Sequence, residues 1–177
     1  MTSLYGATQI ITNTQSKIYI SYNWDDFKFC KQFVDQLSNA TKVPIWVDYK
    51  NAGWDDDMWD YIAPAIESAT IIIVLVSSAY CNSRKNFQEL SYAVAYAKTQ
   101  SRNENDSIIF VETETGIINK REWMSNVSKD KKIIPFPIDE KRMVSEVIGQ
   151  DLLSKGKRTS ITSVFHVPIQ SSVCTVM

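Results

Sequence analysis

An uninterrupted run of six apolar residues, Ile71 to Val76, narrows the choice of fold more than any other segment of this chain. A half-buried strand alternates apolar and polar side chains, and this run does not alternate, so it predicts a strand covered on both faces. Six residues are far too few to span a bilayer. Strands covered on both faces are typical of parallel sheets with helices on either side, so the run predicts an α/β fold.

Further strands and helices are predicted on either side of this run. The other strands are expected at residues 17–22, 44–47, 107–112 and 133–138. Helices are expected after a cap at Asp25 or Asp26, after the acidic run 55–57, after a cap at Ser83, and at about 140–153. Strands that alternate with helices in this way predict a flavodoxin-like doubly wound sheet of five parallel strands in the order 2-1-3-4-5.

Length and composition indicate one folded domain with short extensions. The chain has 177 residues, 44% of them hydrophobic, which is enough for a real core. We expect a loose polar leader at residues 1–16, the domain at 17–154 and a flexible tail at 155–177. The formal net charge of −1 provides no overall field that would recruit nucleic acid.

Several classes of site are excluded by the residues present. The three cysteines form no CxxC pair and His166 is the only histidine, so neither a metal site nor a histidine-activated nucleophile is expected. Five glycines provide no Gly-rich phosphate loop. The third strand ends in Ser77 and Ser78, so it lacks the phosphoacceptor Asp of a response-regulator receiver.

Five segments occur in one order at matching spacing, and together they resemble a Toll/interleukin-1 receptor (TIR) domain over about residues 17–150. They are Ile18-Tyr19-Ile20-Ser21-Tyr22, Ile45-Trp46-Val47-Asp48, Gly53 in an acidic turn, Ala65-Ile66-Glu67-Ser68 before the run at 71–77, and Glu89-Leu90. The resemblance implies the same doubly wound fold. It also implies that Gly53, Trp54 and Asp55 lie in the BB loop, which TIR domains use for self-association.

The resemblance further implies a catalytic role for Glu89. In the NAD-cleaving members of the family, the Glu in the helix after strand three is essential, and Glu89 holds that position in this chain. Many of those members place Trp four residues, or Cys three residues, before this Glu, whereas this chain has Lys85 and Asn86. We therefore expect NAD+ as a substrate, with no further cofactor, and an N-glycosyl hydrolase or cyclase that acts in signalling or defence.

In a doubly wound sheet, ligands bind outside the carboxyl ends of the strands, where the strand order reverses. The side chains that follow strands one, two and three should therefore meet near Glu89. The candidate substrate-binding residues are Ser21, Tyr22, Asn23, Trp24, Asp48, Trp54, Ser78 and Tyr80. Trp24 and Trp54 could stack on nicotinamide or adenine, or could equally serve as packing or interface anchors.

Other interpretations remain open from the sequence. The runner-up is a non-enzymatic TIR scaffold that assembles partners through the BB loop, in which Glu89 would be an ordinary residue near a helix N-terminus. A more distant alternative is another N-glycosidic enzyme, such as a nucleoside deoxyribosyltransferase. The acidic run 55–57 is better explained by electrostatics at a helix start than by metal binding.

The last four residues, Cys174-Thr175-Val176-Met177, fit a CaaX box of the type that favours farnesylation. One prenyl chain binds membranes only marginally, so firm anchoring would need a second signal or self-association. No basic stretch followed by an apolar run begins the chain, so no secretory signal is expected. We expect a cytoplasmic protein that prenylation of Cys174 could bring to a membrane.

Overall fold

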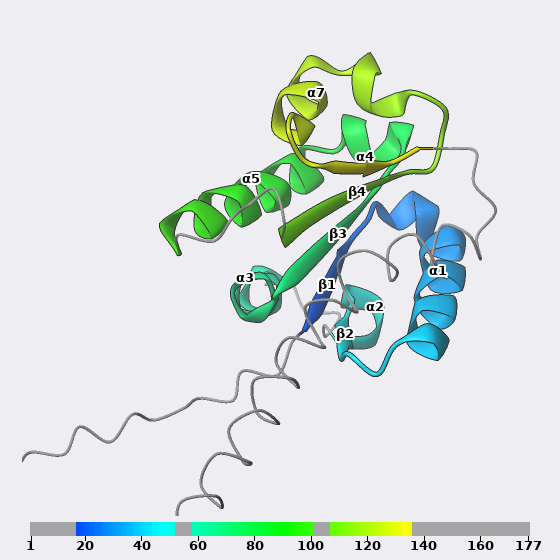
Figure 1. The fold of residues 1–177 in the computed structure, drawn as a ribbon, viewed down its shortest axis with the longest axis vertical. Coiled ribbons are helices and arrows are strands. Elements are labelled where there is room, and N and C mark those ends of the chain that lie inside the picture. The colour runs from blue at the N-terminus through cyan, green and yellow to red at the C-terminus, as the bar shows by residue number, and fades with distance from the viewer. Residues whose placement is uncertain (1–16, 52–57, 101–106, 136–177) are drawn as a thin grey trace, which may run out of the picture.

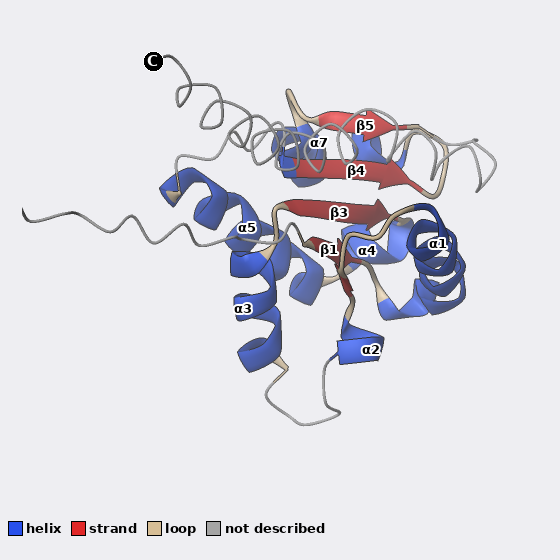
Figure 2. Ribbon diagram, turned by 60° about the horizontal axis from the view of Figure 1, so that its bottom comes forward, coloured by secondary structure: helices blue, strands red, loops and turns tan. Residues whose placement is uncertain are grey.

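Five parallel strands form the centre of the molecule. The computed structural model describes residues 17–51, 58–100 and 107–135. The strands are β1 (Ile18–Ser21), β2 (Ile45–Trp46), β3 (Ile71–Val76), β4 (Ile108–Glu112) and β5 (Lys132–Ile134). Their order, β2-β1-β3-β4-β5, confirms the predicted sheet. The arrowheads of β3, β4 and β5 point the same way in Figure 2.

Helices cover both faces of this sheet (Figure 1). The α-helices are α1 (Phe27–Ala40), α2 (Asp48–Asn51), α3 (Trp59–Ser68), α4 (Ser78–Asn82), α5 (Arg84–Thr99) and α7 (Glu122–Ser128). Two 3-10 helices, η1 (Trp24–Asp26) and η2 (Ile117–Lys120), complete the connections. Helices α1 and α2 lie on one side, whereas α3 and α5 lie on the other. None of the helices described is long and apolar enough to cross a bilayer.

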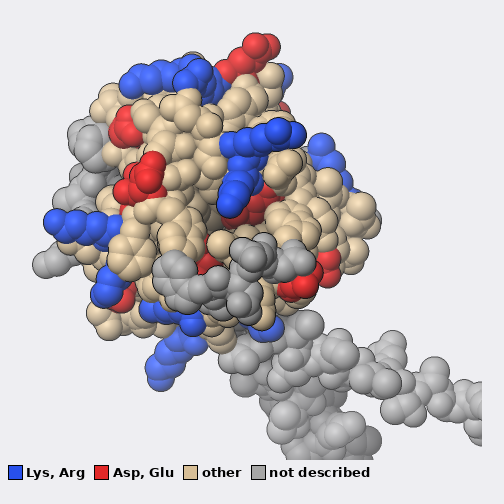
Figure 3. All heavy atoms as spheres, turned by 180° about the vertical axis from the view of Figure 1, so that it is seen from behind, with Lys and Arg blue, Asp and Glu red and all other residues tan. Residues whose placement is uncertain are grey.

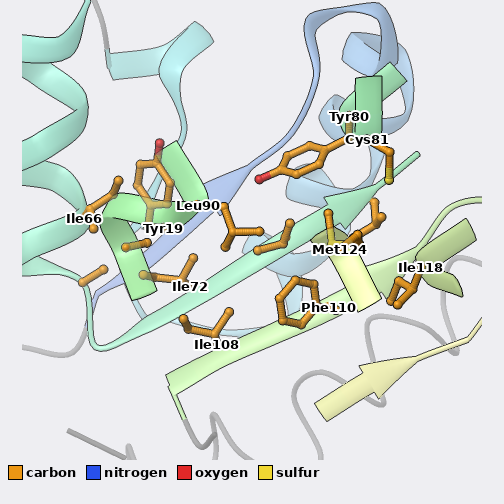
Figure 4. Packing of buried hydrophobic residues seen from close by; sticks show 14 of the residues in the cluster. Tyr19, Ile66, Ile72, Tyr80, Cys81, Leu90, Ile108, Phe110, Ile118 and Met124 are labelled. Carbon is orange, nitrogen blue, oxygen red and sulfur yellow. The ribbon is translucent and has the colours of Figure 1, made fainter. Parts of the chain in front are cut away.

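The all-apolar β3 is buried on both faces, as predicted. Ile71, Ile73 and Leu75 pack into the cluster that contains the inner face of α1. The alternate residues of β3 pack into a second cluster with α3, α4, α5 and α7. Figure 4 shows this second cluster, in which Tyr19 and Tyr80 are the residues that carry hydroxyl groups. Every side chain of β3 is thus buried, and this burial stabilises the centre of the sheet.

The boundaries of several elements differ from those predicted. Neither Asp25 nor Asp26 caps α1 through its side chain; instead Asn23 accepts a hydrogen bond from the Asp25 amide and caps η1. Strand β5 begins one residue earlier than predicted, and residues 136–138 lie outside the described ranges. A short helix, α2, occupies the beginning of the predicted loop 48–56. The leader, the helix predicted at 140–153 and the tail also lie outside those ranges.

Candidate active site

Glu89 lies in the second turn of α5, where it is partly buried against the sheet. The helix begins at Arg84 because the Ser83 hydroxyl accepts a hydrogen bond from the amide of Asn86, as the sequence predicted. The Tyr19 hydroxyl donates a 2.7 Å hydrogen bond to Oε1 of Glu89. The carboxylate is therefore fixed to the central part of the sheet, although it belongs to a helix on the outer layer.

The alternation of β1 explains why hydroxyl groups gather beneath Glu89. Ile18 and Ile20 point toward α1, so Tyr19 and Ser21 point to the opposite side, where α5 lies. The Ser21 hydroxyl shares a 2.7 Å hydrogen bond with the hydroxyl of Tyr80, which comes from α4. Tyr19, Ser21 and Tyr80 thus form a polar lining within a largely apolar layer.

Burial raises the pKa of Glu89 to about 7. Hydrogen bonds from Tyr19 and Ser21 oppose this effect, because they stabilise the charged form, whereas the negative charge of Asp48 adds to it. A carboxylic acid in this environment changes its charge near neutral pH. Such perturbed groups cluster at functional sites, although structural networks also produce them.

Asp48 holds Trp24 near the end of β1. Oδ2 of Asp48 accepts a 2.7 Å hydrogen bond from the indole N–H of Trp24, and Oδ1 accepts one from the amide of Tyr49. Trp24 remains 42% exposed. Burial raises the pKa of Asp48, against the hydrogen bonds that it accepts. Trp24 and Asp48 are therefore brought together, and the ring is presented to solvent.

Tyr22 and Asn23 lie apart from the polar lining. Tyr22 belongs to the cluster on the α1 side of the sheet, where its ring meets Tyr49 edge to face. Asn23 donates a 2.7 Å hydrogen bond to the side-chain oxygen of Asn86, whose own amide group donates to the backbone oxygen of Tyr22. Asn86, which from the sequence alone is only a departure from the enzymes of the family, thus connects α5 to the chain that leaves β1.

Ser78 and Tyr80 have partners within the protein. The amide and hydroxyl groups of Ser78 both donate to the carboxylate of Glu114, at 2.7 and 2.6 Å, and these bonds lower the pKa of Glu114. Tyr80 is fully buried, so we expect it to affect a ligand only through Ser21. Glu114 was missed from the sequence, although its position just beyond β4 places it at the same edge of the sheet.

The remaining predicted residues lie outside the described ranges: Gly53, Trp54, Asp55 and Cys174. Within the described parts of the chain, no group of His, Cys, Asp and Glu side chains is arranged to hold a metal ion. Figure 3 shows the face of the molecule opposite that of Figure 1, where acidic and basic side chains are interspersed. That face therefore presents no single-sign field to a highly charged partner.

Three solved structures share this fold at 12 to 14% sequence identity. The TIR domain of the Toll-related receptor TRR-2 from Hydra magnipapillata gives a TM-score of 0.55 and 14% identity, over 79% of this chain and 97% of its own. A prokaryotic SEFIR domain gives 0.52 and 12%, over 75% and 89%. The TIR domains of the activated Roq1 resistosome, which recognises the pathogen effector XopQ, give 0.50 and 13%, over 89% and 90%.

Identity this low shows a common fold and no more. A search of curated proteins found no match. The family assignment comes from a sequence model described as TIR domain, which matches residues 18–133 and therefore most of the chain. This match runs from β1 to β5 and includes Glu89, Tyr19 and Asp48. With the strand order and the matched residues in agreement, the chain belongs to the TIR domain family.

Proposed function

We propose that this TIR domain cleaves the N-glycosidic bond of NAD+ and releases nicotinamide with ADP-ribose or a cyclic isomer of it, as a signal or a defence response. The observation that carries the proposal is the hydrogen bond at 2.7 Å from the Tyr19 hydroxyl to the carboxylate of Glu89, a residue that is only partly buried. Its partner Tyr19 belongs to β1, which with β3 flanks the point where the strand order reverses, and ligands bind near that point in folds of this class. The TIR family contains both NAD-cleaving enzymes and scaffolds, and this carboxylate favours the enzyme.

The reaction requires little machinery beyond one carboxylate. Nicotinamide is cationic while it is attached to the ribose, so it leaves as a neutral base with the electron pair of the broken C–N bond and needs no proton donor. The ribose then carries oxocarbenium character, which a nearby negative charge stabilises. Water, or a ring nitrogen of the adenine for a cyclic product, attacks the anomeric carbon. A water nucleophile loses its proton afterwards.

The environment of Glu89 suits this electrostatic role. A pKa of about 7 means that a substantial fraction of the free enzyme carries the neutral acid at physiological pH. A bound nicotinamide cation would favour the charged form, because an opposite charge within a few ångströms lowers the pKa of a carboxyl group. Substrate binding would thus generate the anion that the transition state requires.

The decisive experiment measures nicotinamide release from NAD+ by the purified full-length chain and by Glu89→Gln. Loss of one preorganised electrostatic contact typically slows a reaction by about 100-fold or more. The matched control is Glu67→Gln, since Glu67 on α3 also accepts a hydrogen bond from a tyrosine, but that tyrosine, Tyr92, belongs to α5 and not to β1. Turnover by Glu89→Gln equal to that of the wild type would refute the catalytic role.

Scaffolding is the second candidate, because several large apolar side chains are exposed. They include Trp24, Phe27, Tyr61, Phe87 and Ile133. Aromatic side chains that face solvent often serve as anchors in protein–protein interfaces. A wild-type protein that self-associates but releases no nicotinamide at any concentration would favour the scaffold over the enzyme.

A further inference from the structure

We infer that Tyr19 is a positioning residue for Glu89: its hydroxyl group holds Oε1 of the carboxylate in place and favours the charged form. The inference rests on the proposed function, because it assigns the group that prepares Glu89 for its role. The two residues are 70 positions apart in the sequence and meet only because β1 runs beneath α5.

The Tyr19 ring is itself held rigidly, so it can fix the carboxylate. Only 2% of the Tyr19 side chain is exposed. Its ring stacks on that of Trp46 from β2, with 5.0 Å between the ring centroids and 18° between the planes. Offset stacking of this kind adds to the energy of burial and restricts rotation of the ring. The hydroxyl oxygen therefore has one position, and Glu89 must adopt a matching rotamer to receive its hydrogen.

The hydroxyl group is not needed for packing. Tyr19 is surrounded by the apolar cluster of α3 and α5, and a phenylalanine ring would bury the same carbon atoms. Within the described residues, the partner of the Tyr19 hydroxyl is Glu89. A buried phenol without a partner would cost stability, so the hydroxyl and the carboxylate depend on each other. This interdependence points to the carboxylate as the reason for a tyrosine at this position.

The other groups that face Glu89 act separately from Tyr19. Ser21, whose hydroxyl shares a hydrogen bond with that of Tyr80, also lowers the pKa of Glu89. Asp48 acts only through its charge, which opposes ionisation of Glu89. Removing the Tyr19 hydroxyl leaves Ser21, Tyr80 and Asp48 in place. Any change in the pKa of Glu89 can therefore be assigned to the hydrogen bond from Tyr19.

The direct test is an NMR titration of the Glu89 side-chain carboxyl carbon in the wild type and in Tyr19→Phe. The signal is assigned by its disappearance in Glu89→Gln. Loss of a hydrogen bond to the charged form should raise the pKa of Glu89 by about one pH unit. The matched control is Tyr92→Phe, which removes the hydroxyl that donates to Glu67 from the same helix, and it should leave the titration of Glu89 unchanged.

A second measurement changes the hydrogen bond in the opposite direction and preserves the shape of the residue. Site-specific 3-fluorotyrosine at position 19 has a more acidic hydroxyl, which donates a stronger hydrogen bond and should lower the pKa of Glu89. An unchanged pKa of Glu89 in both Tyr19→Phe and the fluorinated protein would overturn the inference. This readout needs no turnover, so it decides the role of Tyr19 even if the wild type fails to cleave NAD+ and the proposed function is lost.

The activity of Tyr19→Phe provides the kinetic counterpart. A higher pKa leaves less of the carboxylate charged at low pH, so kcat/KM should fall about tenfold at pH 6 and recover substantially by pH 9. A residue that only stabilises the fold would lower kcat/KM by a similar factor at both pH values. Such a uniform loss, with no displacement of the pH profile, would overturn the inference.

Discussion

The burial of Glu89 reduces the stability of the fold at pH values where the side chain is charged in water, and a neutral side chain would not have this effect. Its pKa in the folded protein is about 7, above the ordinary value of 4.5. Below about pH 4.5 the group is neutral in both the folded and the unfolded chain. Between about pH 4.5 and 7 the unfolded chain ionises while the folded protein keeps the neutral acid, so this residue lowers the stability of the fold over that range, and the loss persists at higher pH.

We therefore predict that Glu89→Gln raises the free energy of unfolding at pH 8 by roughly 2 kcal/mol, with a much smaller effect at pH 5. Glutamine keeps the size of the side chain and removes the charge. Urea denaturation of both proteins at the two pH values measures the difference. An equal effect at pH 5 and pH 8 would show that the charge of Glu89 is not the cause.

A second prediction at this scale concerns catalysis by the wild type. If the charged form of Glu89 is required, kcat/KM for NAD+ should rise with pH through about 7, since this ratio reports the ionisation of the free enzyme. The rise in kcat should occur at lower pH, because the nicotinamide cation favours the charged form in the complex. A profile that is flat from pH 5.5 to 8.5 would contradict the assignment.

At the scale of elements, α5 is aligned on the sheet by more than its apolar face. Asn86, one turn before Glu89, is only 6% exposed and contacts two successive residues beyond β1. Its amide group donates to the backbone of Tyr22 at 3.0 Å, and its oxygen accepts from Asn23. These bonds fix the position of α5 along β1, and they therefore also fix the position of Glu89 relative to Tyr19.

Asn86→Ala should reduce the free energy of unfolding by about 2 kcal/mol. The substitution removes the side-chain donor to the oxygen of Tyr22 and one of the two acceptors of the Asn23 amide, which keeps Ala79, and a buried unsatisfied polar group costs about 1–3 kcal/mol. Urea denaturation measures the loss. The control is Asn126→Ala in α7, where the side chain is exposed and the change should stay within about 0.5 kcal/mol. Equal losses in the two variants would mean that the contacts of Asn86 contribute nothing of their own.

At the scale of the whole molecule, we predict that specific activity rises with protein concentration. The resemblance assigns the segment between α2 and α3, which includes Gly53 and Trp54, to contacts between domains. If a neighbouring copy completes the site, Trp54→Ala should weaken both self-association and NAD+ cleavage. Light scattering and nicotinamide release over a dilution series test this together.

The matched control for that series is Trp59→Ala. Trp59 is also an exposed tryptophan, but it begins α3 and rests edge-on against Tyr92. We expect it to leave the concentration dependence unchanged. Specific activity that stays constant over a wide dilution range in the wild type would show that one copy suffices.

Structural features that depend only on residues close together in the chain could be predicted from the sequence. The unbroken apolar run of β3 predicted a strand covered on both sides, and Ser83 predicted the start of α5. Helix α1 begins directly after Asp26, as predicted, but the Asp26 side chain accepts a hydrogen bond from Ser77 instead of capping its own helix. That bond joins positions 51 residues apart, so no local pattern could reveal it.

The sequence by itself determined the order of strands and helices, the family and the position of Glu89, because each of these follows from local periodicity or from a short motif. Only the tertiary structure decided what Glu89 contacts. Tyr19 could have been one more core aromatic, and Ser78 could have faced a ligand instead of Glu114. Side chains on different elements meet only after the sheet twists and the helices pack on it. The pKa of a carboxyl group depends on that packing and not on its neighbours in the chain.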